Sequence, residues 1–461
     1  MKESLESYIA LNAERYPDRI AVICGDECCT YAQLNSRIDD RATQLRASTS
    51  SPLPHGGGGG GEANPLVCLR ASASIDFLVS YFALHRAGFA VAPMERDMPS
   101  ATFEAVEQEL SRHPIPEGTA DVLYTTGTTG KSKGVLISHR TIIADAENLI
   151  AGQGFSHDLT FVVNGPLNHI GSLSKIYPVV MLGATLVIVD GLKDVNAFFD
   201  AFSTHLRVEG IPARYATFLV PASIRILIQF SADRLAALAD RMDFIETGAA
   251  AISQADMQTL CSLLPHTRLY NTYASTETGI ISTYNFNDGR CQAGCLGHTM
   301  PHSHLFITEQ GTIACQGDTL MTGYIGDPER TATVLRDNTL FTSDLGRLDD
   351  EGMLHLAGRQ DDVINVGGFK VAPTEVEDAA MAYPLIKDCI CIPVEHKITG
   401  TALKLLVVML DGHTLDKRAL ALHLKSRLEP YKIPLLYEAV PAIQRTFNGK
   451  LNRKAYMKPS F

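Results

Sequence analysis

The sequence predicts an α/β protein with a large N-terminal lobe of parallel sheets flanked by helices and a small α+β C-terminal lobe. Short apolar runs that are typical of buried strands alternate with helical segments up to about residue 350, which favours parallel sheets covered by helices. The last 100 residues follow a different pattern. With 461 residues, of which 45% are hydrophobic, the chain can bury the cores of two or three domains. We expect one domain over residues 1–360 and a second over 361–461.

Residues 5–50 predict a helix, a hairpin and a second helix. The turn at Gly25 separates two short apolar runs, which indicates a hairpin, and apolar residues then recur at helical spacing up to residue 45. An unbroken glycine run, Gly56–Gly61, is typical of a flexible surface linker. Further strands of the large lobe are expected at residues 66–69, 160–163, 184–189 and 242–245.

The C-terminal part is expected to form a separate lobe. The polar segment Gly358–Asp362 is a candidate linker. The patterns beyond it predict a short strand, a helix from Thr374, strands at 389–392 and 403–409, and a helix from Leu415.

Charge and composition exclude several classes of protein. Lysine and arginine number 40 against 51 acidic residues, which argues against a nucleic-acid partner because phosphate backbones are bound by clustered cations. No apolar run reaches the roughly 18–20 residues of a membrane-spanning helix, and the polar N-terminus lacks a signal-peptide core. A cytoplasmic protein is expected, with its ten cysteines reduced.

The stretch 123–139 carries the strongest functional signal. Six small residues precede two lysines, Lys131 and Lys133, and a strand follows. Small residues let backbone N–H groups approach an anion, hydroxyls add donors and lysines add charge, so the stretch predicts a loop that binds nucleotide phosphates. The spacing of a Walker P-loop is absent. The six residues are Thr125, Thr126, Gly127, Thr128, Thr129 and Gly130.

This stretch resembles the signature of the adenylate-forming superfamily, which includes acyl- and aryl-CoA synthetases, adenylation domains of peptide synthetases and firefly-type luciferases. The family pattern is Tyr-Thr-Ser-Gly-Thr-Thr-Gly-x-Pro-Lys-Gly-Val, and this chain has Thr126 at the serine and Ser132 at the proline. Both replacements keep the loop small. The resemblance implies a small barrel-like β part in the large lobe and a mobile small lobe.

Further motifs follow in the family order. The segment Tyr270–Glu277 resembles Asn-x-Tyr-Gly-x-Thr-Glu. The resemblance implies that Asn271 contacts the adenine edge and that Tyr273 stacks on its face. It also implies that Thr276 holds the α-phosphate and that Glu277 holds Mg²⁺, a cation that prefers carboxylate oxygens.

The segment Phe341–Gly346 resembles the family motif Tyr-x-Thr-Gly-Asp-Leu. By this resemblance Asp344 accepts hydrogen bonds from both ribose hydroxyls, which a two-oxygen carboxylate can do, and Arg359 also contacts the ribose. Ser343 here, and Ala274 in the preceding motif, stand where the family has glycine.

Two further segments of the large lobe resemble family motifs, and a third is shorter than in the family. The segment Thr247–Ala251 resembles the Gly-Gly-Ala loop beside the adenine and the acyl group. The resemblance implies that Gly248 and Ala249 help to bind the nucleotide. Gly323–Thr331 resembles a mainly structural element. Only 24 residues, 100–123, stand where family members usually carry a further strand–helix unit, so the lobe is expected to be trimmed.

Two motifs near the C-terminus imply the moving parts of the family. The segment Gly358–Glu377 resembles the family hinge and the residues that follow it. This resemblance implies that Asp361 is the hinge and that Gly367 and Gly368 line the thioester-forming site. The other, Arg445–Lys454, resembles the C-terminal lysine motif, with Lys450 as the catalytic lysine.

The implied reaction is ATP-dependent activation of a carboxylic acid through an acyl-adenylate, followed by transfer to a thiol, with ATP, Mg²⁺ and coenzyme A as cofactors. The segment Pro166–Leu173 resembles the opening of the acyl pocket in CoA ligases, where His169 either gates the pocket or packs. Amino-acid-activating members carry an aspartate there, and residues 164–175 contain none. A fatty or aryl acid is therefore expected.

Alternatives stay open at the level of the sequence. The segment after the hinge resembles CoA ligases, which favours CoA over a carrier-protein phosphopantetheine as the acceptor. A stand-alone enzyme that loads a carrier protein is the first alternative, and a degenerate nucleotide-binding protein without turnover is the second. The sequence is compatible with a monomer or a homodimer.

Overall fold

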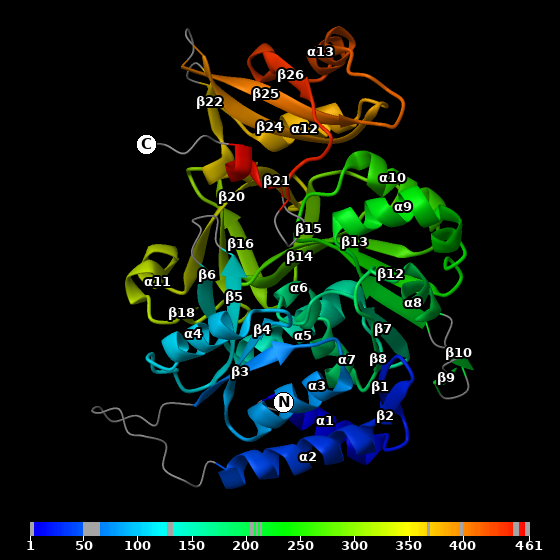
Figure 1. Ribbon diagram of the computed structural model, residues 1–461, viewed down its shortest axis with the longest axis vertical. Coiled ribbons are helices and arrows are strands. Elements are labelled where there is room, and N and C mark those ends of the chain that lie inside the picture. The colour runs from blue at the N-terminus through cyan, green and yellow to red at the C-terminus, as the bar shows by residue number, and fades with distance from the viewer. Residues whose placement is uncertain are drawn as a thin grey trace.

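The computed structural model describes residues 4–48, 65–126, 132–202, 207–208, 211–212, 214–366, 369–396, 400–445 and 451–456. Figure 1 shows a large part, blue to yellow, and a smaller orange and red part stacked above it. The glycine run Gly56–Gly61 lies outside the described residues.

The N-terminal segment folds as a helix, a hairpin and a helix, which confirms the prediction. Gly25 adopts a φ of +58° in the hairpin turn, a conformation that glycine reaches without steric cost. The predicted apolar stripe, including Leu34 and Ile38, is buried against the large core. The elements are α1 (Glu6–Arg15), β1 (Ile20–Cys24), β2 (Glu27–Thr30) and α2 (Tyr31–Ser48).

The large part is built on a mixed sheet of fourteen strands within the described residues. Its centre is parallel, in the order β13-β12-β11-β7-β8-β1, and its strands are largely buried, as helix-covered parallel strands require. The strands are β7 (Leu159–Val163), β8 (Thr185–Ile188), β11 (Arg214–Phe218), β12 (Met242–Thr247) and β13 (Arg268–Ser275). The helices between them are α5 (His139–Gln153), α6 (Ile170–Leu173), α7 (Ile176–Leu182), α8 (Val195–Asp200), α9 (Pro221–Ala236) and α10 (Gln254–Leu263), and a short hairpin adds β9 (Arg207–Val208) and β10 (Ile211–Pro212).

A second sheet has the order β18-β6-β5-β4-β3. Its antiparallel hairpin of β5 and β6 frames residues 127–131, and β18 pairs with the free edge of β6. The strands are β3 (Leu66–Ala71), β4 (Ala90–Glu95), β5 (Thr119–Thr126), β6 (Ser132–Ser138) and β18 (Gly323–Tyr324), with helices α3 (Ile75–Arg86) and α4 (Ser100–Leu110). Between β4 and β5 the chain forms only α4, consistent with a trimmed lobe.

Beyond β13 every strand of the large sheet pairs antiparallel. The edge strand β16 lies back against β14 and β15, so this end of the sheet curls into the barrel-like part that the resemblance implies. The elements are β14 (Gly279–Asn285), β15 (Cys295–Thr299), β16 (Ser303–Ile307), β17 (Thr312–Gly317), α11 (Pro328–Val334), β19 (Leu335–Arg336), β20 (Thr339–Leu348) and β21 (Leu354–Arg359).

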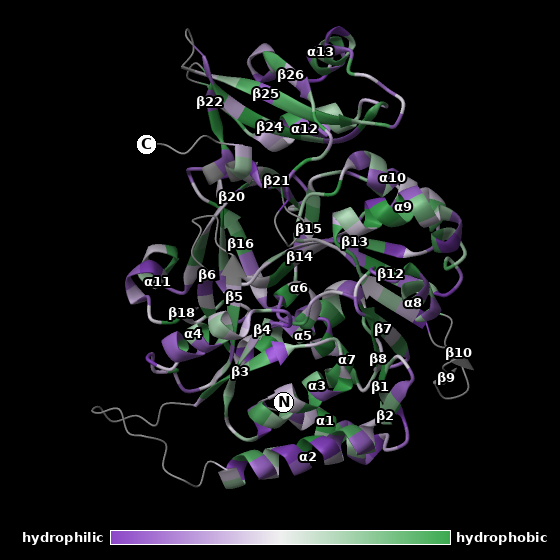
Figure 2. Cartoon of the chain, in the orientation of Figure 1, coloured by the Kyte–Doolittle hydropathy of each residue, from purple (hydrophilic) through white to green (hydrophobic). Residues whose placement is uncertain are grey.

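The C-terminal residues have a hydrophobic core of their own. Val371, Val376, Leu405 and Leu420 are among its fully buried members, and Figure 2 shows β24 and β25 as mostly hydrophobic ribbons. The elements are η1 (Gln360–Asp362), β22 (Ile364–Val366), β23 (Phe369–Val371), α12 (Pro373–Met381), β24 (Ile386–His396), β25 (Gly400–Met409), α13 (Lys417–Lys425), η2 (Pro430–Lys432), β26 (Leu436–Ala439) and η3 (Arg453–Tyr456). The helix and strand predictions for this lobe are confirmed, and the domain boundary at residue 360 stays a prediction.

Two sequence-based expectations need correction. The strand–helix alternation ends at β13 rather than near residue 350, because hairpin-connected strands show the same short apolar runs as parallel strands. The proposed linker Gly358–Asp362 is also not wholly irregular, since Gly358 and Arg359 complete β21, where Arg359 pairs with Asp344 of β20. Within the described residues no helix is long and apolar enough to cross a membrane.

Candidate active site

The acidic side chain Asp344 is held from two sides. Asp344 of β20 and Arg359 of β21 are register partners, which puts the Arg359 Nε 3.1 Å from the Asp344 Oδ1. From β13, the Tyr273 hydroxyl donates to the Asp344 Oδ2 over 2.8 Å. Burial and the neighbouring Asp344 raise the pKa of Tyr273 well above its usual value, so this hydroxyl stays protonated and donates. The carboxylate of Asp344 keeps 22% of its side-chain surface exposed, enough to meet a further donor. We call Tyr273, Asp344 and Arg359 the ribose-end cluster.

Ser343 supports this cluster. The Arg359 Nη2 donates to the Ser343 Oγ over 2.8 Å. A glycine at position 343, as in the family pattern, has no hydroxyl to accept this bond. The departure from the pattern therefore has a structural role, because it holds the guanidinium in place.

Asn271 lies on the same face of β13 as Tyr273, since side chains alternate along a strand. Its Nδ2 donates to the Cys295 carbonyl over 3.0 Å, and the side chain is buried. This bond fixes the orientation of the amide. The loop after β12 passes close by: a Cβ on Gly248 would lie 2.9 Å from the Thr272 carbonyl oxygen. Only glycine permits that approach without a shift.

Ala249 adopts a φ of +66°. This left-handed conformation is unfavourable for a residue with a Cβ, and the family pattern has glycine here. Ala249 is therefore a strained position next to β13, as is found at functional loops.

Thr276 and Glu277 lie in the turn between β13 and β14. The Tyr324 hydroxyl donates to the Glu277 Oε1 over 3.1 Å, and the Lys133 Nζ lies 5.1 Å from the centroid of the Tyr324 ring. Burial lowers the pKa of Lys133, and the charges of Arg330 and Arg359 lower it further while Glu277 acts in the opposite sense. These shifts indicate that Lys133 shares one electrostatic environment with Glu277 and Arg359. We call Lys133, Glu277 and Tyr324 the phosphate-end cluster.

The predicted phosphate loop belongs to the hairpin next to this cluster. Thr125 pairs with Lys133 and Thr126 with Ser132, so the two strands close on the loop. Gly127, Thr128, Thr129 and Gly130 lie outside the described residues, as do the side chains of Thr125 and Thr126. On the other edge of β6, Tyr324 pairs with Val135, which brings Tyr324 beside Lys133.

His169 precedes α6 and is half-buried. In the neighbouring loop the Asn164 Nδ2 donates to the Thr217 Oγ1 over 2.9 Å and to the Phe218 carbonyl over 3.1 Å. These bonds fix the carboxyl ends of β7 and β11, where ligands of parallel sheets commonly bind.

A buried ion pair lies beneath this region. The Lys175 Nζ is 2.8 Å from the Glu246 Oε1, and both side chains are 1% exposed. Glu246 directly precedes Thr247, so the pair supports the root of the loop that holds Gly248. Because its charge is neutralised by Glu246, Lys175 is not available as a partner for a substrate carboxylate.

The predicted hinge and catalytic lysine are only partly described. Asp361 lies in η1 with its side chain outside the described residues, and Gly367, Gly368 and Lys450 also lie outside them. The residues that flank Lys450 are firmly held: Arg445 forms a β-bridge with Leu451.

Two carboxylates fix those flanks. The Arg445 Nη2 contacts both carboxylate oxygens of Asp388 at 2.7 and 2.8 Å. Arg453 forms a bidentate, buried pair with Glu377 at 2.7 and 2.8 Å. Asp388 also lies 3.9 Å from Arg225 of α9 in the large part, so the Arg445–Asp388 pair faces the large lobe.

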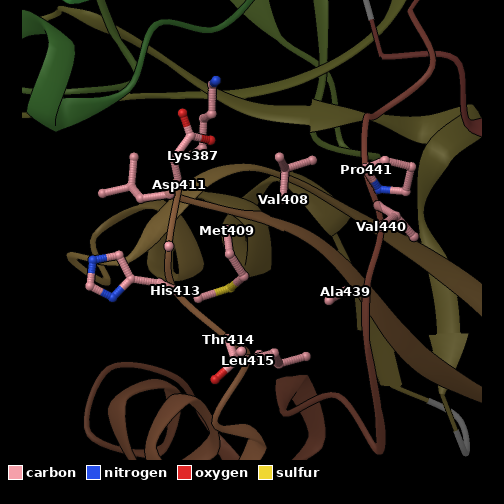
Figure 3. Close-up of a pocket in the computed structure, with 12 residues that line it drawn as sticks. Lys387, Val408, Met409, Asp411, His413, Thr414, Leu415, Ala439, Val440 and Pro441 are labelled. Carbon is pink, nitrogen blue, oxygen red and sulfur yellow. The ribbon is translucent and has the colours of Figure 1, made fainter.

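Figure 3 shows a separate hollow in the small part, lined among others by Lys387, Met409, Asp411, His413 and Pro441. No predicted site residue lines it. We assign it no role.

Sequence reasoning missed two contributors. Tyr324 lies in the motif Gly323–Thr331, which the sequence analysis interprets as mainly structural. The motif itself was the one sign that this residue matters, and its contact with Glu277 is seen only in the structure. The Lys175–Glu246 pair had no signal, because the two residues are 71 positions apart.

Comparisons with known proteins identify the family. A family model described as "AMP-binding enzyme" matches residues 101–325, and one described as "AMP-binding enzyme C-terminal domain" matches 375–450. A feruloyl-CoA synthase of Amycolatopsis sp is 28% identical over 492 residues, with 97% of each chain covered. Tyrocidine synthase 2 of Brevibacillus parabrevis is 25% identical over 97% of this chain and 13% of its own length.

The fold also matches a solved structure, ATP-bound MatB from Rhodopseudomonas palustris, with a TM-score of 0.83, 22% identity and 99% coverage of both chains. The two family models occur in the family order and together span most of the described chain. The chain therefore belongs to the adenylate-forming superfamily of AMP-binding enzymes and is an AMP-forming acid–thiol ligase.

Proposed function

We propose that the enzyme is an ATP-dependent carboxylic acid–CoA ligase that activates a fatty or aryl acid as an acyl-adenylate and transfers it to the thiol of coenzyme A. The observation that carries the proposal is the ribose-end cluster, in which Asp344 is oriented by Tyr273 and Arg359 while part of its carboxylate stays exposed. The full-length similarity to a feruloyl-CoA synthase supports the acid–CoA part.

The ribose-end cluster would hold the nucleoside. An exposed, oriented carboxylate can accept two hydrogen bonds from a vicinal diol, which suits Asp344 to the ribose. The Tyr273 ring and the buried Asn271 amide share a strand face, as needed for stacking on the adenine and contact with its edge. Gly248 and Ala249 border the same strand.

The phosphate-end cluster would hold the triphosphate. Lys133 and the loop ahead of it supply positive charge and N–H donors, and Thr276 supplies a hydroxyl at the α-phosphate. Glu277 is a half-buried carboxylate with one oxygen bonded to Tyr324, a hard ligand of the type that Mg²⁺ takes. Mg²⁺ at Glu277 supplies charge neutralisation at the phosphates.

The proposed chemistry has two balanced steps. An oxygen of the substrate carboxylate attacks the α-phosphorus, the bond to the β-phosphate oxygen breaks, and pyrophosphate leaves. A thiolate sulfur then attacks the acyl carbon and AMP leaves. We assign Lys450 to the first step, where its charge reduces repulsion between carboxylate and phosphate, and Gly367 and Gly368 to the second. Rotation at Asp361 would exchange them.

The class of acid is proposed from the residues that would line the acyl pocket. Residues 164–175 contain no acidic side chain. The carboxylate of Glu246 below them is already paired with Lys175. A charged ammonium on the substrate would therefore have no partner from this segment, which disfavours α-amino acids. We place His169 at the entrance of this pocket.

The test is ATP–pyrophosphate exchange across a panel of fatty, aryl and amino acids, followed by AMP release with CoA. We expect exchange with one fatty or aryl class and AMP release that depends on CoA. Exchange confined to amino acids, or no exchange by an enzyme that binds ATP, would overturn the proposal; the latter outcome would support the degenerate nucleotide-binding alternative.

A carrier-loading enzyme is the second candidate, favoured by the similarity to tyrocidine synthase 2 over nearly the whole chain. The free thiol of a phosphopantetheine arm is chemically the same as that of CoA. The discriminating arm of the experiment replaces CoA with a phosphopantetheinylated carrier protein. Transfer to the carrier without CoA turnover would replace the first proposal with this one.

A further inference from the structure

Two histidines and two carboxylates from distant parts of the sequence meet on the side of the phosphate hairpin opposite its loop. Glu6 begins α1, His85 lies in the last turn of α3 and His139 begins α5. The groups Glu6, His85 and His139 each offer one ligand atom, and these three atoms lie within 4.8 Å of one another. Nothing in the acid–CoA ligase chemistry uses them.

The two imidazole rings are close and crossed. The ring centroids of His85 and His139 are 5.2 Å apart with an interplanar angle of 77°. Glu6 is 8% exposed and His85 5% exposed, whereas His139 is only partly buried. One side of the cluster is therefore open to solvent, which provides an entry path for an ion.

A carboxylate behind His85 fixes its tautomer. The His85 Nε2 lies 3.1 Å from the Asp121 Oδ1 and 3.2 Å from the Ala120 carbonyl oxygen. A carbonyl oxygen only accepts, so Nε2 donates and the lone pair of the neutral ring is on Nδ1. The second oxygen of Asp121 accepts from the Tyr81 hydroxyl over 2.7 Å. A histidine whose other nitrogen donates to a carboxylate is the usual arrangement of a metal-ligating histidine.

Glu6 supplies the independent observation. Its Oε2 is buried and has no hydrogen-bond partner among the described residues, although an unpartnered buried carboxylate oxygen is costly. Its backbone is held in place because the Arg86 Nη2 donates to the Glu6 carbonyl over 2.9 Å. The side chain therefore presents an unused anionic oxygen to a pair of imidazoles.

We propose that Glu6, His85 and His139 bind a Zn²⁺ ion, with water as the fourth ligand and Asp121 orienting His85. Two imidazoles and one carboxylate are a donor set that suits zinc, and the +2 charge would neutralise two buried carboxylates. Zinc ligands about 2.0–2.1 Å from the metal lie roughly 3.4 Å from one another. The side chains therefore need only small rotations to close on the ion.

The proposed site links three helices to the hairpin that frames the phosphate loop. Asp121 lies in β5, and the His139 N–H bonds the Gly118 carbonyl over 3.0 Å at the base of that hairpin. α1 and α3 are in contact and both lie at the lower end of the molecule in Figure 1. Zinc would therefore fasten the N-terminal helix to the root of the phosphate hairpin.

The experiment uses the full chain, treated with a chelator, dialysed and titrated with Zn²⁺ alone. We expect one equivalent of zinc per chain by elemental analysis and calorimetry, and a melting temperature raised by a few degrees at saturating zinc. Co²⁺ in place of zinc should give the visible absorption of a bound, low-symmetry ion.

Three variants and a control locate the ion. Glu6→Gln and the partly exposed His139→Gln should each remove the bound equivalent and the thermal shift. Asp121→Asn should weaken binding by about 10- to 100-fold. His304→Gln changes an exposed histidine of β16 and should bind zinc like the unmodified chain. Zinc bound at another place, such as exposed Cys28, adds the same amount to all four altered proteins and does not affect their comparison.

The outcomes separate cleanly. Loss of one equivalent in Glu6→Gln and His139→Gln but not in His304→Gln supports the site. No zinc on the unmodified chain, or equal stoichiometry and equal thermal shift in all variants, overturns it. If a variant fails to fold, the Co²⁺ spectrum of the unmodified chain decides, because the absence of a visible band at saturation also overturns the proposal.

Discussion

The two ends of the nucleotide site are built in different ways. The ribose-end cluster consists of side chains on three strands of the large sheet, of which β20 and β21 pair directly, so the backbone of each residue is fixed by its own strand pairing. The phosphate-end cluster consists of residues from a turn, from the loop end of a hairpin and from a two-residue strand, and its lysine contacts a ring face rather than a carboxylate. In the proposed reaction the nucleoside would stay bound through both steps, whereas pyrophosphate would leave after the first. Paired strands suit the first task, and a turn beside a lysine that has no carboxylate partner at close range among the described residues suits the second.

The largest effect is expected at Lys450, which we assign to the step at the α-phosphate. Lys450→Ala should lower ATP–pyrophosphate exchange by about 1000-fold, the scale of removing one charged donor from a transition state. It should largely spare thioester formation from supplied acyl-AMP, which no longer needs that charge. Both half-reactions would be assayed separately, and an equal loss of both would refute the assignment. Asp361→Pro is the matched opposite, since it should spare exchange and impair the thioester step.

A buried acid behind the phosphate end should make stability depend on pH. The Asp145 Oδ1 accepts the Ile280 N–H over 2.8 Å just after the Glu277 turn, and burial raises the pKa of Asp145 from 3.8 to about 7. The folded chain thus keeps a proton that the unfolded chain loses near pH 4. The free energy of unfolding therefore falls between about pH 4 and 7, by on the order of 2–4 kcal/mol from this group.

Asp145→Asn should remove that fall. Urea unfolding of both proteins between pH 5 and pH 8.5 measures it, and the difference in stability should grow in favour of the variant up to about pH 7 and then level off. A constant difference across this range would show that Asp145 is ionised in the folded chain throughout.

At the ribose end, Asp344→Asn should raise the KM for ATP by roughly 10- to 100-fold, because a charged acceptor is lost and the Arg359 guanidinium loses its counter-ion. The maximal exchange rate should change less. Ser343→Gly is the control, since it removes only the hydroxyl that accepts from Arg359 and leaves the Asp344 charge in place, so it should cost a few-fold. An unchanged KM for ATP in Asp344→Asn would show that the ribose-end cluster does not bind the nucleotide.

Tyr324→Phe tests whether the phosphate end depends on the single hydrogen bond that Tyr324 donates to Glu277. Loss of the hydroxyl that orients Glu277 should reduce exchange by roughly two- to tenfold and raise the Mg²⁺ concentration needed for half-maximal rate. Tyr8→Phe on α1 provides a matched control away from the site. If the Mg²⁺ requirement were the same in all three proteins, Tyr324 would not act through Glu277.

The smallest effects concern neighbouring loop positions with opposite expected signs. Ala249→Gly should raise the free energy of unfolding by about 1 kcal/mol, because glycine tolerates the φ of +66°. Gly248→Ala should lower it by a similar amount or more, since its Cβ would lie 2.9 Å from the Thr272 carbonyl oxygen. Urea unfolding measures both, and stabilisation by neither or by both would contradict this account of the loop.

The sequence by itself determined the elements and the order of the motifs. Periodic apolar residues predicted α1, α2 and the strands of both lobes because helices and strands have different side-chain periods. The resemblance to the family motifs implied roles for Asn271, Tyr273, Asp344 and Arg359, and the structure shows that Tyr273, Asp344 and Arg359 meet.

Only the tertiary structure decided which distant residues share an environment. Strand pairing placed Tyr324 beside Lys133, and packing placed Lys175 against Glu246 and Glu6 beside His85. Pairing of segments tens to hundreds of residues apart leaves no local period or spacing in the chain. The apolar runs alone also did not predict that half of the large sheet is antiparallel, because a short apolar run does not specify the direction of the neighbouring strand.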